Sequence, residues 1–331
     1  MTATIGRRTF VVGLGSAAVA WPLAGRAQAP GRIYHIGFLI PSPRDRLPVA
    51  ALFDELRLHG FIENQNLEVL PGGFGFRNEE LAELAAALVK AAPDAIVAGP
   101  ELPLRALRAA TRTVPIIGIS EDLVAEGLAD SLAHPGGNIT GISLLSPELD
   151  GKRQEILIEA VLSARQIAAM FDSNVTPPYH LQTLQHAARS RGVGLSIFGV
   201  KGPEDIVSAI DAAKASGAEA LNFLATPLFS VPGSRNNEIV LERIMTIRLP
   251  TIFQWPETAE AGAVLAYGPR FTDVYRQRGR IVAKILRGTK PAEIPVEQPT
   301  RFELVINLKA AKTIGHQVPA GLVARADKVI E

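Results

Sequence analysis

Short apolar segments alternate with amphipathic segments along most of the chain, and this alternation restricts the fold more than any other feature. The segment 33–40, IYHIGFLI, is mostly apolar and is followed by a proline, which is typical of a buried strand. Segment 48–59 then places Leu52 and Leu56 on one helical face and ends before Gly60. Such units with short links predict a parallel sheet covered by helices on both faces. Further strands are expected at 66–70, 95–98 and 115–119, and further helices at 79–92 and 102–111.

The alternation pauses between residues 133 and 150 and then begins again. PGGN at 135–138 predicts a turn, 139–144 a strand, and Ser146-Pro147 a break. The second series is too long to extend the same sheet comfortably, so we predict two doubly wound α/β lobes joined by extended crossings. Its strands are expected at 167–171, 193–200, 219–224 and 251–253, and its helices at 152–163, 178–190, 203–215 and 236–247.

The last third of the chain is less regular. We expect strands at 264–267 and 302–306, a long amphipathic helix at 271–286, and short helices at 310–314 and 319–329. The predicted boundaries are a first lobe over 31–143, a second lobe over 144–252, a return to the first lobe over 253–297, and a segment over 298–331 that packs on the second lobe.

The N-terminal residues have the features of an export signal. Residues 1–29 contain no Asp or Glu, and Arg7-Arg8 precedes an apolar or small stretch from Phe10 to Leu23. We predict a signal peptide over 1–27, cleaved after Ala27, and a periplasmic mature protein. The twin arginine fits the twin-arginine export route, although the general secretory route stays open. The stretch of roughly 14 residues is shorter than the ~20 that span a bilayer. A dinucleotide-binding loop at GLGSAA is disfavoured, because no strand precedes it and no acid follows about 20 residues later.

Composition excludes several classes of function. Of the 331 residues, 47% are hydrophobic and 20% are charged, and the formal net charge is +1. The predicted signal peptide carries three arginines and no acid, so the mature chain carries −2 and shows no electrostatic sign of binding nucleic acid or membranes. The chain has no cysteine and therefore neither disulfides nor thiol ligands. The motifs H-E-x-x-H, G-x-S-x-G and G-x-x-x-x-G-K-[ST] are also absent. We expect no catalytic residues, no metal site and no cofactor.

The predicted strands also locate a ligand pocket. In open parallel sheets, ligands bind beyond the carboxyl ends of the strands. The segments in that position are 41–44, 99–101, 120–122, 172–176, 226–230 and 254–257. From them we predict as ligand-binding residues Ser42, Arg44, Glu101, Ser120, Asp122, Asp172, Asn174, Thr226, Phe229, Gln254 and Trp255.

Each of these residue types also has an ordinary structural use. Trp255 and Phe229 are suited to stacking on a ligand but equally to packing within a lobe. Ser42 and Ser120 are suited to donating to a carboxylate or to capping a helix. Asp172 and Asn174 are suited to holding a ligand ammonium or to forming a turn. The residue types alone leave these alternatives open.

Several blocks of sequence resemble one family throughout the chain. The most specific are PGGNITG at 135–141 and PTRFELVINLKAAK at 299–312, together with HGFIENQN at 59–66 and ELDGKRQEIL at 148–157. They resemble the periplasmic substrate-binding proteins of ABC transporters, whose characterised members resemble aromatic amino-acid binders. The resemblance implies a type I periplasmic-binding-protein fold with two lobes joined by a hinge that closes on a small-molecule ligand. It also implies delivery to an ABC permease and its ATPase. We expect a monomer.

Two positions depart from the pattern of this family. The family usually has Gly-Thr-Pro or Gly-Ser-Pro near the third strand, where this chain has Pro100-Glu101-Leu102. It usually has Glu-Trp where this chain has Gln254-Trp255. A carboxylate at Glu101 repels an anionic ligand group unless a cation intervenes, and Arg44 is a candidate counter-charge to Glu101 or to a ligand carboxylate. We therefore infer a ligand that binds in a shifted orientation or is not a standard α-amino acid.

These observations predict an extracytoplasmic solute-binding component of an importer that captures an amino acid or a related aromatic or carboxylate compound. A sensory protein that uses the same cleft but docks on a receptor is the main alternative. An exported enzyme on the same scaffold is a weaker one, and it would carry a titratable cluster with strongly shifted pKa values in its cleft.

Overall fold

The computed structural model describes residues 31–144 and 146–331, and residues 33–331 form one compact unit. The predicted signal peptide at 1–27 lies outside the described residues. Within the described part, no helix has both the length and the apolar character needed to cross a bilayer.

The first sheet is parallel, with strand order β2-β1-β3-β4-β5. Val97 of β3 packs against α1 and α10 on one face, while Ile96 and Ala98 pack against α2 and α3 on the other. Because both faces are covered, β3 reads AIVA without a polar residue. The elements are β1 (Tyr34–Leu39), α1 (Leu47–Leu58), β2 (Leu67–Val69), α2 (Leu81–Lys90), β3 (Ala95–Ala98), α3 (Glu101–Ala110), β4 (Ile116–Ser120), β5 (Ile139–Ser143) and α10 (Phe271–Leu286).

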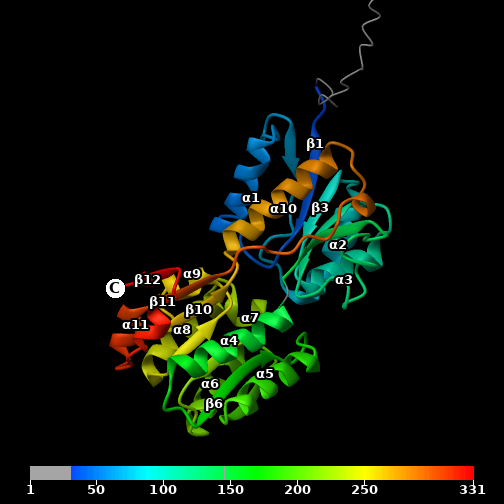
Figure 1. Cartoon of the computed structure of the whole chain (residues 1–331). Coiled ribbons are helices and arrows are strands. Elements are labelled where there is room, and N and C mark those ends of the chain that lie inside the picture. Colours follow the sequence, from blue (N-terminus) through cyan, green and yellow to red (C-terminus); the bar gives the residue numbers. More distant parts are fainter. Residues whose placement is uncertain (1–30, 145) are drawn as a thin grey trace, which may run out of the picture. The chain divides into compact units, whose positions relative to one another are not determined.

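The second sheet has strand order β12-β11-β10-β9-β8-β6-β7, in which β10 and β11 are antiparallel and the other pairs are parallel. The side chains of Ala168 and Met170 in β6 join the core under α6 and α8, whereas Ile167 joins the core under α4. Figure 1 shows these helices around the second sheet. The strands are β6 (Gln166–Asp172), β7 (Gly194–Val200), β8 (Leu221–Phe223), β9 (Thr251–Phe253), β10 (Leu265–Gly268), β11 (Glu303–Asn307) and β12 (Lys328–Ile330). The helices are α4 (Ser146–Ala160), α5 (Pro178–Ser190), α6 (Ile206–Ala215), α7 (Pro227–Ser230), α8 (Arg235–Ile247), α9 (Pro256–Glu260), α11 (Leu308–Thr313) and α12 (Ala320–Val323). Single 3₁₀ turns lie at Asn78–Glu80, Pro203–Asp205 and Pro291–Glu293.

The structure differs from the sequence prediction at three places. Helix α4 begins at Ser146 rather than at residue 152, because a proline in the first helical turn removes only an N–H that has no intrahelical partner there. The helix predicted at 319–329 ends at Val323, and residues 328–330 pair with β11 as β12. The return to the first lobe begins near Phe271 rather than at residue 253, because β10 pairs with both β9 and β11.

Extended segments connect the lobes after β5, after β10 and after residue 297. The last of these segments runs beside β5. The backbone N–H of Ser143 donates to Glu297 O at 3.0 Å, and the N–H of Glu297 donates to Gly141 O at 2.8 Å. The buried hydroxyl of Thr140 donates to Ile294 O at 2.7 Å. The segment that leaves the first lobe and the segment that returns past it are thus hydrogen-bonded side by side. Such parallel connections between two lobes are suited to a hinge.

Helix α10 packs along α1, although more than 200 residues separate them in sequence, and Figure 1 shows the two helices side by side. Gly279 lies at their contact. A Cβ at this position would lie 2.9 Å from Glu55 Cβ and 3.0 Å from Leu52 O. The absence of a side chain therefore lets the two helices approach closely.

Substituting Gly279→Ala is expected to lower the free energy of unfolding by about 1–2 kcal/mol, because the overpacking outweighs the gain in helix propensity. Gly321→Ala in α12 is the matched control, since no heavy atom lies within 4 Å of its added Cβ. The control is expected to be neutral or slightly stabilising. Chemical denaturation of both variants measures the difference, and equal effects at the two positions would contradict the packing argument.

Candidate functional site

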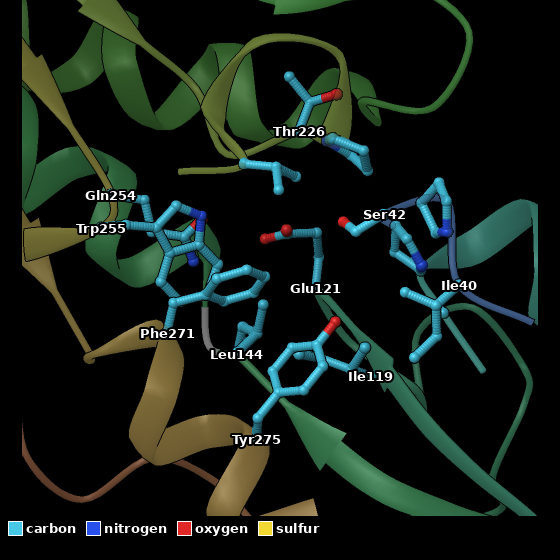
Figure 2. A pocket seen from close by; sticks show the side chains of 15 residues that line it. Ile40, Ser42, Ile119, Glu121, Leu144, Thr226, Gln254, Trp255, Phe271 and Tyr275 are labelled. Atoms are coloured by element: carbon cyan, nitrogen blue, oxygen red, sulfur yellow. The ribbon is translucent and has the colours of Figure 1, made fainter. Parts of the chain in front are cut away.

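A cavity lies beyond the carboxyl ends of the strands of both sheets. It encloses about 500 Å³ of space between atoms, including its mouth. Ser42 follows β1, Gly99 follows β3 and Glu121 follows β4, all in the first lobe, while Thr226 follows β8 and Trp255 follows β9 in the second. Figure 2 shows Ser42, Glu121, Thr226 and Trp255 arranged around a common space. The cavity is therefore built by the segments that parallel-sheet topology brings together.

Aromatic side chains form one side of the cavity. The ring centroids of Trp255 and Phe271 are 4.5 Å apart, and those of Phe271 and Tyr275 are 5.0 Å apart in an edge-to-face arrangement. Phe271 and Tyr275 are four residues apart on α10, so they project from the same helical face. Trp255 precedes α9 and comes from the second lobe. The three rings thus provide an aromatic wall to which both lobes contribute.

Glu121 supplies the charged group among the residues that line this cavity. Its carboxylate points into the space between Ser42 and the aromatic side chains (Figure 2). The Oε2 atom is buried and has no hydrogen-bond partner. Burial raises the pKa of Glu121 well above its usual range, and the nearby carboxylates of Glu101 and Asp150 raise this pKa further, while Arg153 opposes them.

Two further carboxyl groups lie close to Glu121 without lining the main cavity. Burial raises the pKa of Glu101, although backbone N–H groups, including that of Glu121, lower this pKa in part. Burial, followed by the charge of Glu101, raises the pKa of Glu126 to about 7. The Oε2 atom of Glu126 is also buried without a partner. The first lobe therefore presents several carboxyl groups whose ionised forms are disfavoured.

The second lobe presents a buried ion cluster to the same region. Asp150 pairs with Arg153 on α4 and with Nδ1 of His180 on α5. Arg153 is fully buried and also donates to Tyr267 O at 3.4 Å. His180 borders a small side pocket that it shares with Glu101, Glu121 and Thr226. Asp150 thus offsets much of the effect that the positive charge of Arg153 has on Glu121.

Four of the predicted ligand residues line the main cavity: Ser42, Thr226, Gln254 and Trp255. Gln254 is almost completely buried, and its Nε2 has no hydrogen-bond partner. Thr226 Oγ1 donates to Asp172 Oδ2 at 3.2 Å and accepts from the N–H of Leu228, so it also caps α7.

The other predicted residues lie elsewhere. Glu101, Asp172 and Asn174 border an adjacent groove, in which Asp172 also accepts from the N–H of Asn174 at 2.9 Å. Arg44 pairs with Glu63 and lies over the ring of Phe53 rather than beside Glu101, so the prediction of a counter-charge to Glu101 is wrong. Ser120 is buried at the end of its strand, beside Glu126. The carboxylate of Asp122 accepts from the N–H groups of Val124 and Ala125 in a turn. Phe229 packs in the core of the second lobe.

Sequence reasoning missed Glu121, Phe271 and Tyr275. Glu121 lies within the predicted segment 120–122, but the sequence does not show which of its three residues points inward. Phe271 and Tyr275 were recognisable as an i, i+4 pair on an amphipathic helix that the sequence assigned to the first lobe, but not as residues of the cavity wall.

Glu126→Gln is expected to change how stability depends on pH. The native state holds a proton on Glu126 up to about pH 7, whereas the unfolded chain releases it near pH 4.3. Stability of the unsubstituted protein therefore falls as pH rises between these values, by up to about 3 kcal/mol. Glutamine removes this contribution, so the variant is expected to gain stability relative to the parent between pH 5 and pH 8. Urea unfolding at both values measures the gain, and a pH-independent difference would contradict the burial of this group.

Comparison with known proteins places this architecture in a family. A family model described as ABC transporter substrate binding protein matches residues 62–330. A tyrosine-binding protein of Clostridioides difficile is 25% identical over 211 residues, which span 63% of this chain and 59% of that protein. The match thus covers less than two thirds of the relative's length.

Solved structures share the fold. An ABC domain from Streptococcus pneumonia in complex with L-Trp superposes with a TM-score of 0.78 at 21% identity, covering 90% of this chain and 100% of that chain. A conserved domain protein from Vibrio cholerae gives a TM-score of 0.76 at 23% identity, covering 90% and 99%. The predicted two-lobed type I periplasmic-binding-protein fold is confirmed, and the chain belongs to the family of ABC transporter substrate-binding proteins.

Proposed function

We propose that this protein is the solute-binding component of an ABC importer. It captures a small organic solute with an aromatic or apolar body in the cavity between its lobes and delivers it, chemically unchanged, to a membrane permease and its ATPase. The cavity carries this proposal, because both lobes and α10 contribute to its wall and Trp255, Phe271 and Tyr275 form a nearly continuous aromatic surface within it.

Closure of the two lobes on the ligand is the step that would link binding of the solute to its delivery. A ligand that touches Ser42 and Glu121 in one lobe and Thr226 and Trp255 in the other is held by both, so it stabilises the arrangement in which they approach. The hydrogen-bonded crossing segments beside β5 limit the motion to bending at the connections. A permease that recognises both lobes together would then distinguish the loaded protein from the empty one.

The expected location and partners follow from the family. A binding protein of an importer acts outside the cytoplasm, which agrees with the signal peptide predicted at 1–27. The proposed partners are a small molecule, the permease and its ATPase. The protein is proposed to act as a monomer, with no role for nucleic acid.

The relatives suggest the first compounds to test. One relative is named a tyrosine-binding protein, and a solved structure of the same fold holds L-Trp. A thermal-shift screen over aromatic amino acids, aromatic amines, aromatic acids and small peptides is expected to show stabilisation by at least one class. A ligand at about 100 times its Kd adds roughly 2.7 kcal/mol to the free energy of unfolding. A screen in which no solute stabilises the protein, or in which a solute is converted into product, would contradict the proposal.

The variants Phe271→Leu and Phe229→Leu distinguish a loss of ligand contact from a loss of core packing. Both phenylalanines are buried, but Phe271 lines the cavity and Phe229 lies in the second-lobe core. Each substitution is expected to cost about 1–3 kcal/mol of stability. Only Phe271→Leu is expected to weaken binding of the solute found in the screen, by about 3- to 10-fold, because it removes an aromatic face. Calorimetric titration checks this, and equal losses of affinity would place the solute outside the cavity.

A further inference from the structure

The cavity has an unusual balance of charges for a site that binds an amino acid. Among the described residues that line it, Glu121 carries a carboxylate, and none is Lys, Arg or His. The aromatic surface faces the same space as this carboxylate (Figure 2). A carboxylate with one buried, unpartnered oxygen beside aromatic faces is a combination that attracts positive charge.

Three arginines around the cavity interact with groups outside its lining. Arg278 lies behind Tyr275, with its guanidinium carbon 5.0 Å from the ring centroid, and it donates to Ala98 O at 2.7 Å and Ile117 O at 3.2 Å. Arg153 pairs with Asp150, and Arg44 pairs with Glu63. Nε and Nη1 of Arg278 have no hydrogen-bond partner among the described residues, but none of these three arginines lines the cavity.

Backbone donors are also scarce where an anionic group would need them. Pro41, Pro100 and Pro227 line the cavity and have no N–H. Pro100 precedes α3 and Pro227 is the first residue of α7, so prolines occupy helix starts that elsewhere bind anions. The N–H of Gly99 donates to Leu39 O, and that of Leu144 donates to Ser120 O. The side-chain donors in the wall, such as the Ser42 hydroxyl and the unpartnered Nε2 of Gln254, are neutral. A ligand carboxylate would thus meet Glu121 with neutral donors and no cation among the described residues of the lining to offset the repulsion.

We propose that the cavity selects an organic cation: a small molecule whose ammonium group pairs with Glu121, whose aromatic or apolar body lies against Trp255, Phe271 and Tyr275, and which carries no free carboxylate. This inference rests on the proposed solute-binding function and names its substrate class. The ammonium group would donate a hydrogen bond to Oε2 of Glu121, which is buried and has no partner in the described part of the chain.

Binding of the cation is linked to release of a proton. Burial raises the pKa of Glu121, and the groups that face it are Glu126 on the loop after β4, Glu101 on α3, Asp150 and Arg153 on α4, and His180 on α5, with Arg278 behind Tyr275. Compared with a glutamate in water, Glu121 in the empty site therefore favours its protonated form. An ammonium favours the carboxylate, so the proton leaves to solvent as the ligand binds, and affinity rises as pH increases toward the pKa of Glu121.

Three compounds with one phenyl group test the charge preference: 2-phenylethylamine, L-phenylalanine and 3-phenylpropionate. They are a cation, a zwitterion and an anion at neutral pH. Isothermal titration at pH 7.5 is expected to give 2-phenylethylamine a Kd at least about tenfold lower than that of either other compound. Its affinity is expected to increase from pH 5 to pH 8, with proton uptake by the buffer.

Glu121→Gln keeps the size of the side chain and removes its charge. This variant is expected to bind 2-phenylethylamine at least about tenfold more weakly, to lose the proton release, and to bind 3-phenylpropionate more tightly than the parent does. Glu126→Gln is the matched control, because it removes a neighbouring acid that does not line the cavity. It is expected to keep the affinity for the amine within about threefold.

The outcomes separate this inference from the function on which it rests. If phenylalanine or 3-phenylpropionate binds more tightly than the amine, the cation preference is wrong while solute binding stands. If the amine binds with unchanged affinity to Glu121→Gln, the assigned contact is wrong. If no compound binds here and none stabilises the protein in the wider screen, both the inference and the proposed function fail.

Discussion

A parallel sheet must be covered on both faces, and this requirement organises the molecule. The first sheet receives α2 and α3 on one face, but on the other the chain supplies only α1 before it crosses into the second lobe. Helix α10 completes that face after more than 200 residues, and its approach to α1 depends on Gly279. The return of α10 creates the additional connections between the lobes. It also brings Phe271 and Tyr275 to the carboxyl ends of the first sheet's strands, so one packing requirement yields both the hinge and part of the cavity wall.

The local elements were predictable because they depend on patterns within a few residues. Helices α5 and α10 and strand β9 have the predicted bounds, because a proline or glycine stands at or near an end of each in the sequence. The strand-end rule also found Ser42, Thr226, Gln254 and Trp255 at the cavity. The rule failed where tertiary contacts decide whether a side chain points into the cavity or into the core. Phe229 follows a strand as Trp255 does, but it turns into the core against Phe223, and no local signal distinguishes the two.

The lobe to which a late segment belongs was the hardest feature to predict. Strand β10 and helix α10 are adjacent in sequence, but one extends the second sheet and the other covers the first. The crossing lies within a few residues around Pro269 and Arg270, whose composition resembles an ordinary turn. Arg270 pairs with Glu260 and Glu303 of the second lobe, and these pairs fix the end of β10 at the boundary. Glu257 accepts from the N–H of Phe271 at 3.3 Å, so a second-lobe carboxylate meets the first turn of α10.

The acidic character of the cleft has a consequence for closure. Burial disfavours the ionised forms of Glu101, Glu121 and Glu126, so ionising them in the empty cleft carries a desolvation penalty. Opening at the hinge returns these groups to solvent and relieves the penalty. A cation in the cavity relieves it while the lobes remain together, because it replaces water as the partner of the carboxylate. A neutral ligand of the same shape fills the space against the aromatic surface but leaves the carboxyl groups in their unfavourable state. If the proposed cation binds here, charge recognition and lobe closure would depend on the same desolvated groups, and selectivity would arise from the energetics of closing as well as from the shape of the cavity.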